Sequence, residues 1–207
     1  MKKGTIWMSL GILLIIAALG LTVYNIWDDK KAEKSSEKAA EDLFEEIIKV
    51  AEEPTSITKV YEKYPNIEMP SKVLNGNRYI GILEFPHYSL SLPVISNWSY
   101  PNLRVAPCRY EGSPYNGDFI IAAHNYRSHF GILKTLVPGD VVRFMDVDGN
   151  LFTYEVASTE ILGGTAVEDM KSGEWDLTLF TCTYGGRTRV TVRFVQIDKD
   201  VEMNGKL

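Results

Sequence analysis

The N-terminal segment is the feature of this sequence that most constrains how the chain can fold. The 24 residues from Gly4 to Trp27 contain no charged side chain and are mostly apolar. An α-helix rises about 1.5 Å per residue, so such a segment spans roughly 36 Å and exceeds the roughly 30 Å hydrocarbon core of a membrane. We therefore expect a transmembrane helix over residues 4–27, preceded by a short tail of residues 1–3.

A cleaved signal peptide is the alternative interpretation of this segment. Lys2 and Lys3 precede the apolar run, and Ala18-Leu19-Gly20 resembles a small-residue cleavage site. The apolar residues continue beyond that site to Trp27, which makes the run longer than the apolar region of a typical signal peptide. The sequence favours an uncleaved anchor. Its orientation stays open, because lysines flank the run on both sides.

The remaining chain, about 180 residues, is long enough for one domain with a substantial core. Residues 28–70 are predicted to form a juxtamembrane linker with a short amphipathic helix that ends at Pro54. The apolar residues that recur there at helical spacing are Leu43, Phe44, Ile47, Ile48 and Ala51. Residues 71–207 form the predicted folded domain.

From Ser71 onward, short β-branched and aromatic runs alternate with turn signals, which is typical of a mainly β structure. Seven or eight strands with little helix between them favour a closed or nearly closed β-barrel over a parallel α/β sheet. Val147–Asn150 fits a tight hairpin turn, and its likeness to a calcium loop lacks the later ligands. The predicted strands are Tyr79–Phe85, Leu90–Ile95, Asp118–Ala123, Val141–Asp146, Leu151–Leu162, Leu177–Cys182 and Arg189–Val195.

Charge and cysteine spacing exclude several classes of function. The net charge of −5 and pI near 5.3 provide no basic surface for nucleic-acid binding. Cys108 and Cys182 lie 74 positions apart, without a C-x-x-C motif, so neither a zinc site nor a thioredoxin-like site is supported. We predict no metal and no cofactor, and a single disulfide stays open.

The pairing of the last two strands decides where Cys182 points. If Cys182 lies opposite Arg189 in an antiparallel hairpin, Leu177–Cys182 and Arg189–Val195 share one apolar face, and Thr183–Thr188 closes the loop. A shift by one residue would place arginines in the core. Cys182 is therefore predicted on the polar face, beside a guanidinium group that can stabilise a thiolate or an oxyanion but cannot act as a base.

A nucleophilic cysteine needs a proton partner, and three histidines are available. His124 follows the apolar run Phe119–Ala123, so it is placed at a strand end from which it can reach another strand end. His129, five residues later, fits a surface or supporting position. His87 lies in a turn and is predicted to be structural. His124 is therefore the predicted partner.

These residues resemble the sortase family. Thr178–Cys182, TLFTC, is similar to the TLxTC signature of sortases, with Arg189 on the next strand and His124 in an A-[AG]-H context at the end of an earlier strand. The resemblance covers most of Arg78–Val195, including LPV at Leu92–Val94. The motifs occur in the expected order behind an N-terminal apolar segment.

The resemblance implies an eight-stranded sortase-type β-barrel and a membrane-anchored cysteine transpeptidase of Gram-positive-type bacteria. Carried over by position, Cys182 is the nucleophile, His124 the general acid and base, and Arg189 the residue that binds the oxyanion or positions the substrate. Thr181 lines the site. Arg187 also lies close to the cysteine in sequence and is the alternative for the role of Arg189.

The implied reaction is cleavage of a C-terminal LPXTG-like sorting signal of surface proteins. The thioacyl intermediate is then transferred to an amine, from a lipid II peptide of the cell wall or from a pilin lysine. The implied topology is single-pass, with a cytoplasmic N-terminus and an extracellular catalytic domain of residues 71–207. A Cys108–Cys182 disulfide would silence such a nucleophile. The short Gly163–Asp176 segment leaves no room for the large helical insertion of class B, and the sequence shows no class C-like aromatic lid motif or second membrane helix. A class D-like or unassigned sortase therefore fits best.

Two other functions stay open at this stage. A cysteine hydrolase or protease would use the same Cys182 and His124 but release its acyl group to water. A noncatalytic, anchored β-domain would bind a cell-wall or protein partner without chemistry at the thiol.

Overall fold

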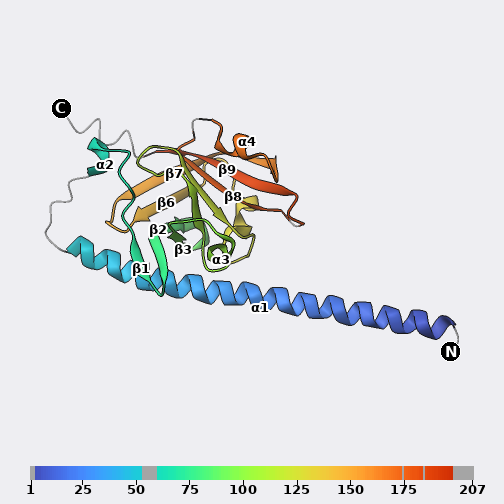
Figure 1. Cartoon of the computed structure of the whole chain (residues 1–207). Coiled ribbons are helices and arrows are strands. Elements are labelled where there is room, and N and C mark those ends of the chain that lie inside the picture. Colours follow the sequence, from blue (N-terminus) through green and yellow to red (C-terminus); the bar gives the residue numbers. More distant parts are fainter. Residues whose placement is uncertain (1–2, 53–59, 174, 184, 198–207) are drawn as a thin grey trace.

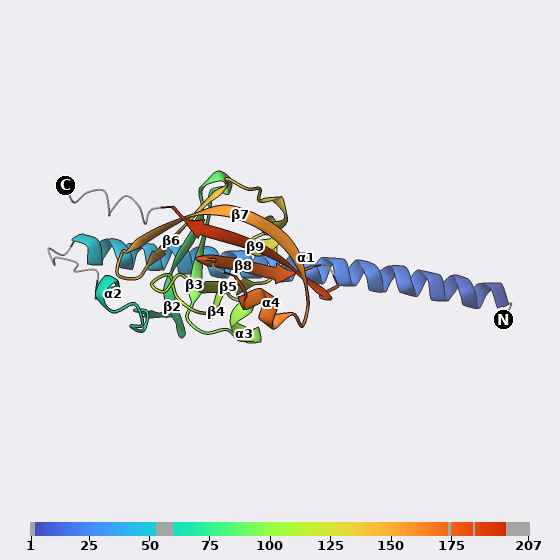
Figure 2. The same cartoon turned by 90° about the horizontal axis from the view of Figure 1, so that it is seen from above.

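The computed structural model describes residues 3–52, 60–173, 175–183 and 185–197. Its longest element is the helix α1, Lys3–Glu52, one half of which lies along a β-barrel while the N-terminal half projects beyond it (Figures 1 and 2). The predicted apolar and amphipathic helices are parts of this one helix, because residues 28–52 continue the apolar segment without a break. Lys, Glu and Ala dominate this stretch and are good helix formers, and no proline or glycine interrupts it. Pro54 lies outside the described residues.

The apolar part of α1 has the properties of a membrane span. Its large side chains are exposed, with Trp7 at 72% and Leu21 at 65%. In the described part of the chain, α1 is the one helix long and apolar enough to cross a membrane. An exposed apolar surface of this extent is typical of a segment that contacts lipid or another protein.

The second part of α1 packs on strands of the barrel through a narrow stripe. Leu43 and Ile47 are buried, as predicted, whereas Phe44 and Ile48 are exposed at 42% and 41%. The stripe continues toward the N-terminus through Ala39 and other small residues, which let the helix approach the sheet closely. The side chain of Ala51 lies outside the described ones. The amphipathic prediction therefore located the correct helix but made its buried face too wide.

The barrel closes through eight strands, β2 to β9, in the order β2-β3-β4-β5-β8-β9-β7-β6, with β6 pairing back to β2. The pairs β3–β4 and β5–β8 are parallel and the others are antiparallel. A further strand, β1, extends the pairing at the start of β2. The strands are β1 Lys72–Leu74, β2 Asn77–Phe85, β3 Leu90–Ile95, β4 Cys108–Glu111, β5 Phe119–Ala123, β6 Val141–Asp146, β7 Leu151–Gly163, β8 Leu177–Cys182 and β9 Thr188–Gln196.

Short helices occupy the connections between strands. They are α2 Val60–Lys63, α3 Tyr100–Leu103, α4 Val167–Lys171 and the 3-10 helices η1 Pro86–Tyr88 and η2 Phe130–Thr135. All seven predicted strands are present, with ends shifted by at most two residues, so the predicted eight-stranded barrel is confirmed. β1 and β4 were not predicted, because runs of three and four residues show too little alternation to be recognised.

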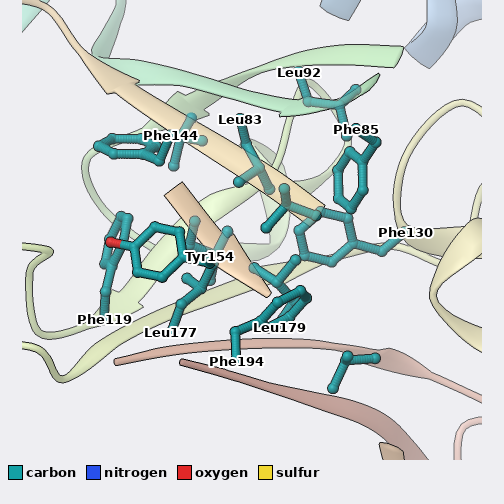
Figure 3. Packing of buried hydrophobic residues seen from close by; sticks show 14 of the residues in the cluster. Leu83, Phe85, Leu92, Phe119, Phe130, Phe144, Tyr154, Leu177, Leu179 and Phe194 are labelled. Carbon is teal, nitrogen blue, oxygen red and sulfur yellow. The ribbon is translucent and has the colours of Figure 1, made fainter. Parts of the chain in front are cut away.

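Aromatic and aliphatic side chains from most strands fill the barrel interior (Figure 3). Leu177 and Leu179 of β8 and Phe194 of β9 are completely buried there, as the period of two along a strand requires. Phe130, at the start of η2, packs edge-on against Phe85 with ring centroids 6.2 Å apart. The loop that follows β5 is thus anchored in the core.

The predicted hairpin turn at Val147–Asn150 connects β6 and β7. The buried Asp146 carboxylate accepts hydrogen bonds of 2.9 Å from the backbone N–H groups of Asp148 and Asn150. Tyr115 donates its hydroxyl to the same carboxylate at 2.7 Å. The Asp146 carboxylate at the end of β6 therefore stabilises the hairpin turn.

Candidate active site

The register of the last hairpin is the one predicted. Cys182 lies opposite Arg189, Thr181 opposite Val190 and Leu177 opposite Phe194. The backbone N–H of Thr183 donates to the carbonyl of Thr188 at 3.0 Å and closes the loop. Gly185 has a φ of 90° within this turn, a conformation that glycine adopts without strain.

The face of the β8–β9 hairpin that carries Cys182 is largely covered, although its polar residues are typical of a solvent-exposed face. Arg193 is only 2% exposed, pairs with Glu160 at 2.6 Å and donates to the carbonyl of Met170 at 2.6 Å. It also donates to Thr178 Oγ1 on β8 at 3.0 Å. A buried, fully paired guanidinium therefore fixes α4 over this face of the sheet, and the face is polar but covered.

The parallel pair β5–β8 brings His124 beside Cys182. Ala123 is the register partner of Thr181, so the next residue of each strand, His124 and Cys182, leaves the barrel at the same end. Thr181 is buried and donates its hydroxyl to the carbonyl of Ala123 at 2.8 Å. This bond holds the two strand ends together.

His124, Cys182 and Arg189 line one cavity of about 220 Å³, which Thr181 also borders. Cys182 and Thr181 additionally border a second cavity of about 200 Å³ under the loop that follows β5. The four predicted site residues thus come together from three adjacent strands, and the half-buried Cys182 borders both cavities.

Aromatic residues that the sequence analysis did not assign form the wall of the first cavity. Trp98, Tyr110 and Phe180 follow one another in edge-on contact, with ring centroids 6.1 Å and 5.3 Å apart. Val167 and Met170 of α4 complete an apolar lining. Phe180 precedes Cys182 by two residues on one strand, so strand periodicity predicts it on the same face as the cysteine, and it borders the same cavity.

The two candidate arginines differ in position. Arg189 lines the cavity, and its Nη1 donates to the carbonyls of Gly186 and Thr188 at 2.9 Å and 3.0 Å. Within the described residues, Nη1 is the atom of this side chain that makes hydrogen bonds. Arg187 is exposed and does not border the cavity.

Both cysteines are free thiols, so the disulfide left open by the sequence is not formed. Cys108 is completely buried, and this burial raises its pKa to about 12. Cys182 is therefore the accessible thiol. Among the described residues, no group of three or more His, Cys, Asp or Glu side chains is arranged to hold a metal ion.

The three histidines lie in three different environments. Burial lowers the pKa of His124, Asp28 acts in the opposite direction, and Arg104 adds to the lowering. His129 is completely buried, so the surface position left open for it is wrong. Burial lowers its pKa to about 4, with a further contribution from His124. His87 is exposed in η1 and away from the cavity.

The burial of His129 predicts acid sensitivity of the fold. Its folded pKa, about 4, lies below the ordinary value of 6.5, so the unfolded chain binds a proton first as the pH falls. The stabilisation that comes from keeping His129 neutral is fully present above pH 6.5. We expect the free energy of unfolding to fall by roughly 3 kcal/mol between pH 6.5 and about pH 4. Urea unfolding across this range should show a smaller loss in His129→Leu than in the wild type. Equal losses in the two proteins would contradict this assignment.

Comparison with known proteins agrees with this fold. The sequence profile of the sortase domain matches residues 83–197. A Clostridium perfringens sortase D5 transpeptidase superposes with a TM-score of 0.58 at 18% identity, over 79% of this chain and 99% of that one. Streptococcus pneumoniae sortase C superposes with a TM-score of 0.61 at 20% identity, over 77% and 96%.

A third solved structure is Clostridium perfringens sortase C with the C-terminal cell wall sorting motif, with a TM-score of 0.52, 20% identity and coverage of 82% and 95%. No curated protein sequence matches the chain significantly. The likeness in fold extends to sortases of both the C and the D type.

The barrel and the match to the family's domain profile define a β-barrel enzyme of the cysteine transpeptidase class. The chain belongs to the sortase family, because the family's domain profile matches more than half of its length.

Proposed function

We propose that this sortase cleaves an LPXTG-like sorting signal of surface proteins between Thr and Gly and transfers the acyl group to an amine. The observation that carries the proposal is the convergence of Cys182, His124 and Arg189 from adjacent strands on one cavity. Residues 71–207 are the proposed catalytic domain, residues 28–70 the linker and residues 4–27 the anchor that follows a short cytoplasmic tail.

In the proposed first half-reaction, the Cys182 thiolate attacks the carbonyl carbon of the substrate threonine. Arg189 donates hydrogen bonds to the oxyanion that forms, or to the adjacent substrate backbone. As the C–N bond breaks, the His124 imidazolium protonates the leaving amine, and a thioester remains on Cys182.

In the proposed second half-reaction, an amine attacks the thioester. His124, now neutral, takes the proton of the incoming amine while the C–S bond breaks and Cys182 leaves as a thiolate. The new amide product departs, and the thiolate–imidazolium pair is restored. The two cavities that Cys182 borders support this sequence, because each offers space for one of the two substrates beside this residue.

The walls of the larger of these two cavities support the proposed donor. Leu and Pro side chains are apolar, and the aromatic and aliphatic lining from β4, β8 and α4 offers them a matching surface. The C. perfringens sortase C structure described with a sorting motif supports the same substrate class for a protein of similar fold. The proposed acceptors are a lipid II peptide of the cell wall and a pilin lysine.

The proposed location is the outer surface of the cell membrane, with the N-terminus in the cytoplasm. The apolar half of α1 projects away from the barrel, as an anchor would (Figure 1). This topology places the site on the side where surface proteins and cell-wall amines meet.

An amine-capture assay tests the proposed transfer. The full chain in detergent is incubated with an LPXTG peptide library, with and without hydroxylamine, triglycine or a lysine-containing pilin peptide. We expect amine-dependent products joined at Thr. Equal amounts of hydrolysed product with and without amine would establish the hydrolase instead, and intact peptide in every case would favour the noncatalytic binding domain.

Arg189→Lys is expected to lower kcat about 100-fold, because a single ammonium group does not replace a planar set of donors aimed at an oxyanion. The matched control is Arg187→Lys, which changes an exposed arginine in the loop just before β9 and should stay near wild-type activity. Steady-state peptide cleavage measures both. If Arg187→Lys is the damaged variant, the assignment of the two arginines is reversed.

A further inference from the structure

The part of α1 that directly follows the apolar run contacts the loop that carries His124. Tyr126 donates its hydroxyl to Asp28 Oδ2 at 2.6 Å, and Ser128 donates to Asp29 Oδ1 at 3.2 Å. These partners lie 98 and 99 positions apart in the sequence. Two successive carboxylates of the helix thus hold two hydroxyls of one loop.

Backbone hydrogen bonds within the loop from His124 to Gly131 hold Tyr126 and His124 in one compact unit. The N–H of Phe130 donates to the carbonyl of His124 at 3.1 Å, and that of Gly131 to the carbonyl of Tyr126 at 2.8 Å. A Cβ atom on Gly131 would lie 2.6 Å from the carbonyl oxygen of Tyr126, which explains why glycine is needed there.

The Tyr126 ring connects the helix contact to the site. Its centroid lies 4.9 Å from that of His124 and 5.5 Å from that of His129. Burial and the hydrogen bond to Asp28 raise the pKa of Tyr126, so the phenol stays a donor. The tyrosine is therefore fixed at both its hydroxyl and its ring face.

Charged and titratable groups face His124 from each element around it. They are Asp28 of α1, Arg104 after α3, Tyr126 and His129 of its own loop, Cys182 of β8 and Arg189 of β9. Asp28 is the carboxylate in this set and raises the pKa of His124 against the effect of burial. Its charge thus supports the imidazolium that the proposed mechanism needs.

We propose that Asp28, acting through Tyr126, is a positioning residue that sets the orientation of His124 in the active site. This inference rests on the proposed role of His124 as general acid and base. It makes the start of the juxtamembrane helix a functional part of the catalytic centre rather than a tether.

The kinetic test uses Asp28→Asn in the full chain in detergent. We expect kcat to fall by about tenfold to 100-fold, with KM within about twofold, because His124 is misplaced while the apolar cavity is intact. The acidic limb of the pH–rate profile should move to lower pH. Tyr126→Phe should give a similar loss, and the double variant should be no worse than either single variant.

The matched control is Glu33→Gln, which removes one negative charge from an exposed position of the same helix. It should keep the wild-type rate and pH profile. Loss of kcat in this control to the same degree would show that net charge on α1, rather than the Asp28 contact, is responsible, and would overturn the proposal.

A second measurement is independent of the sorting substrate. Iodoacetamide alkylates Cys182 selectively, since Cys108 is buried. At about pH 6.5, Asp28→Asn should slow this alkylation about fivefold, because the imidazolium no longer supports the thiolate. The effect should vanish in a His124→Ala background. An unchanged alkylation rate, or the same slowing without His124, would overturn the proposal, whereas failure of amine transfer alone would refute only the proposed function.

Discussion

Cys182→Ala is expected to lower peptide cleavage and transfer by about 10^4-fold or more, because no other group can form the acyl intermediate. The side chain is half-buried at the end of β8, opposite Arg189 and beside the end of β5. Removal of one sulfur atom from this position should leave the strand pairing and the fold unchanged. Chromatographic assay of cleaved and transferred peptide measures the loss.

Cys108→Ala is the matched control for this variant. Cys108 is buried in β4, and its thiol donates weakly to the carbonyl of Ala106 at 3.4 Å. The substitution should cost about 1 kcal/mol of stability through a small cavity and leave activity nearly intact. Substantial activity in Cys182→Ala, or loss of activity in correctly folded Cys108→Ala, would show that the nucleophile is assigned to the wrong cysteine.

His124→Ala is expected to lower kcat about 10^3-fold, the usual scale for loss of a general acid and base. The thiol then lacks both the imidazolium that favours its thiolate and the proton donor for the leaving amine. The measurement is the pH dependence of kcat/KM, in which the limb that His124 contributes should disappear together with most of the activity.

The other two histidines separate catalysis from stability. His87→Ala changes an exposed residue and should behave as the wild type. His129→Ala should have a mild effect on activity per folded molecule but lower the thermal unfolding temperature, because His129 is completely buried. A larger loss of activity in folded His129→Ala than in His124→Ala would mean that the proton partner is His129.

Strand periodicity predicted much of this fold because each barrel strand has one face in a common core. The register of β8 and β9 could be predicted residue by residue, since a shift by one position would place arginines among Leu177 and Leu179. The very short β4 carries no such pattern. The helix α1 is continuous because no proline or glycine lies between residues 28 and 52. This continuity was not predicted, because the apolar and the charged parts of the helix differ so much in composition that they suggest separate elements.

The site was predictable only in part. The alternation of side chains along the two last strands placed Arg189 opposite Cys182. The position of His124 at the end of an apolar strand indicated that it is the proton partner. Contacts between distant segments, such as Asp28 with Tyr126 across 98 positions, have no periodic signal in a single sequence. The burial of Arg193 was also missed, because two of its four acceptors are backbone carbonyls of α4, a helix too short to be recognised beforehand.

The most direct test of the proposed function is the intact mass of the enzyme during turnover. The full chain is mixed with an LPXTG peptide that lacks an amine acceptor, quenched in acid and digested to locate any adduct. The proposed mechanism predicts an acyl adduct, ending at Thr, on the peptide that contains Cys182, and its disappearance with formation of a new amide when triglycine is added. Turnover of the peptide with no adduct on Cys182, or an adduct that amines do not resolve, would contradict acyl transfer at this site.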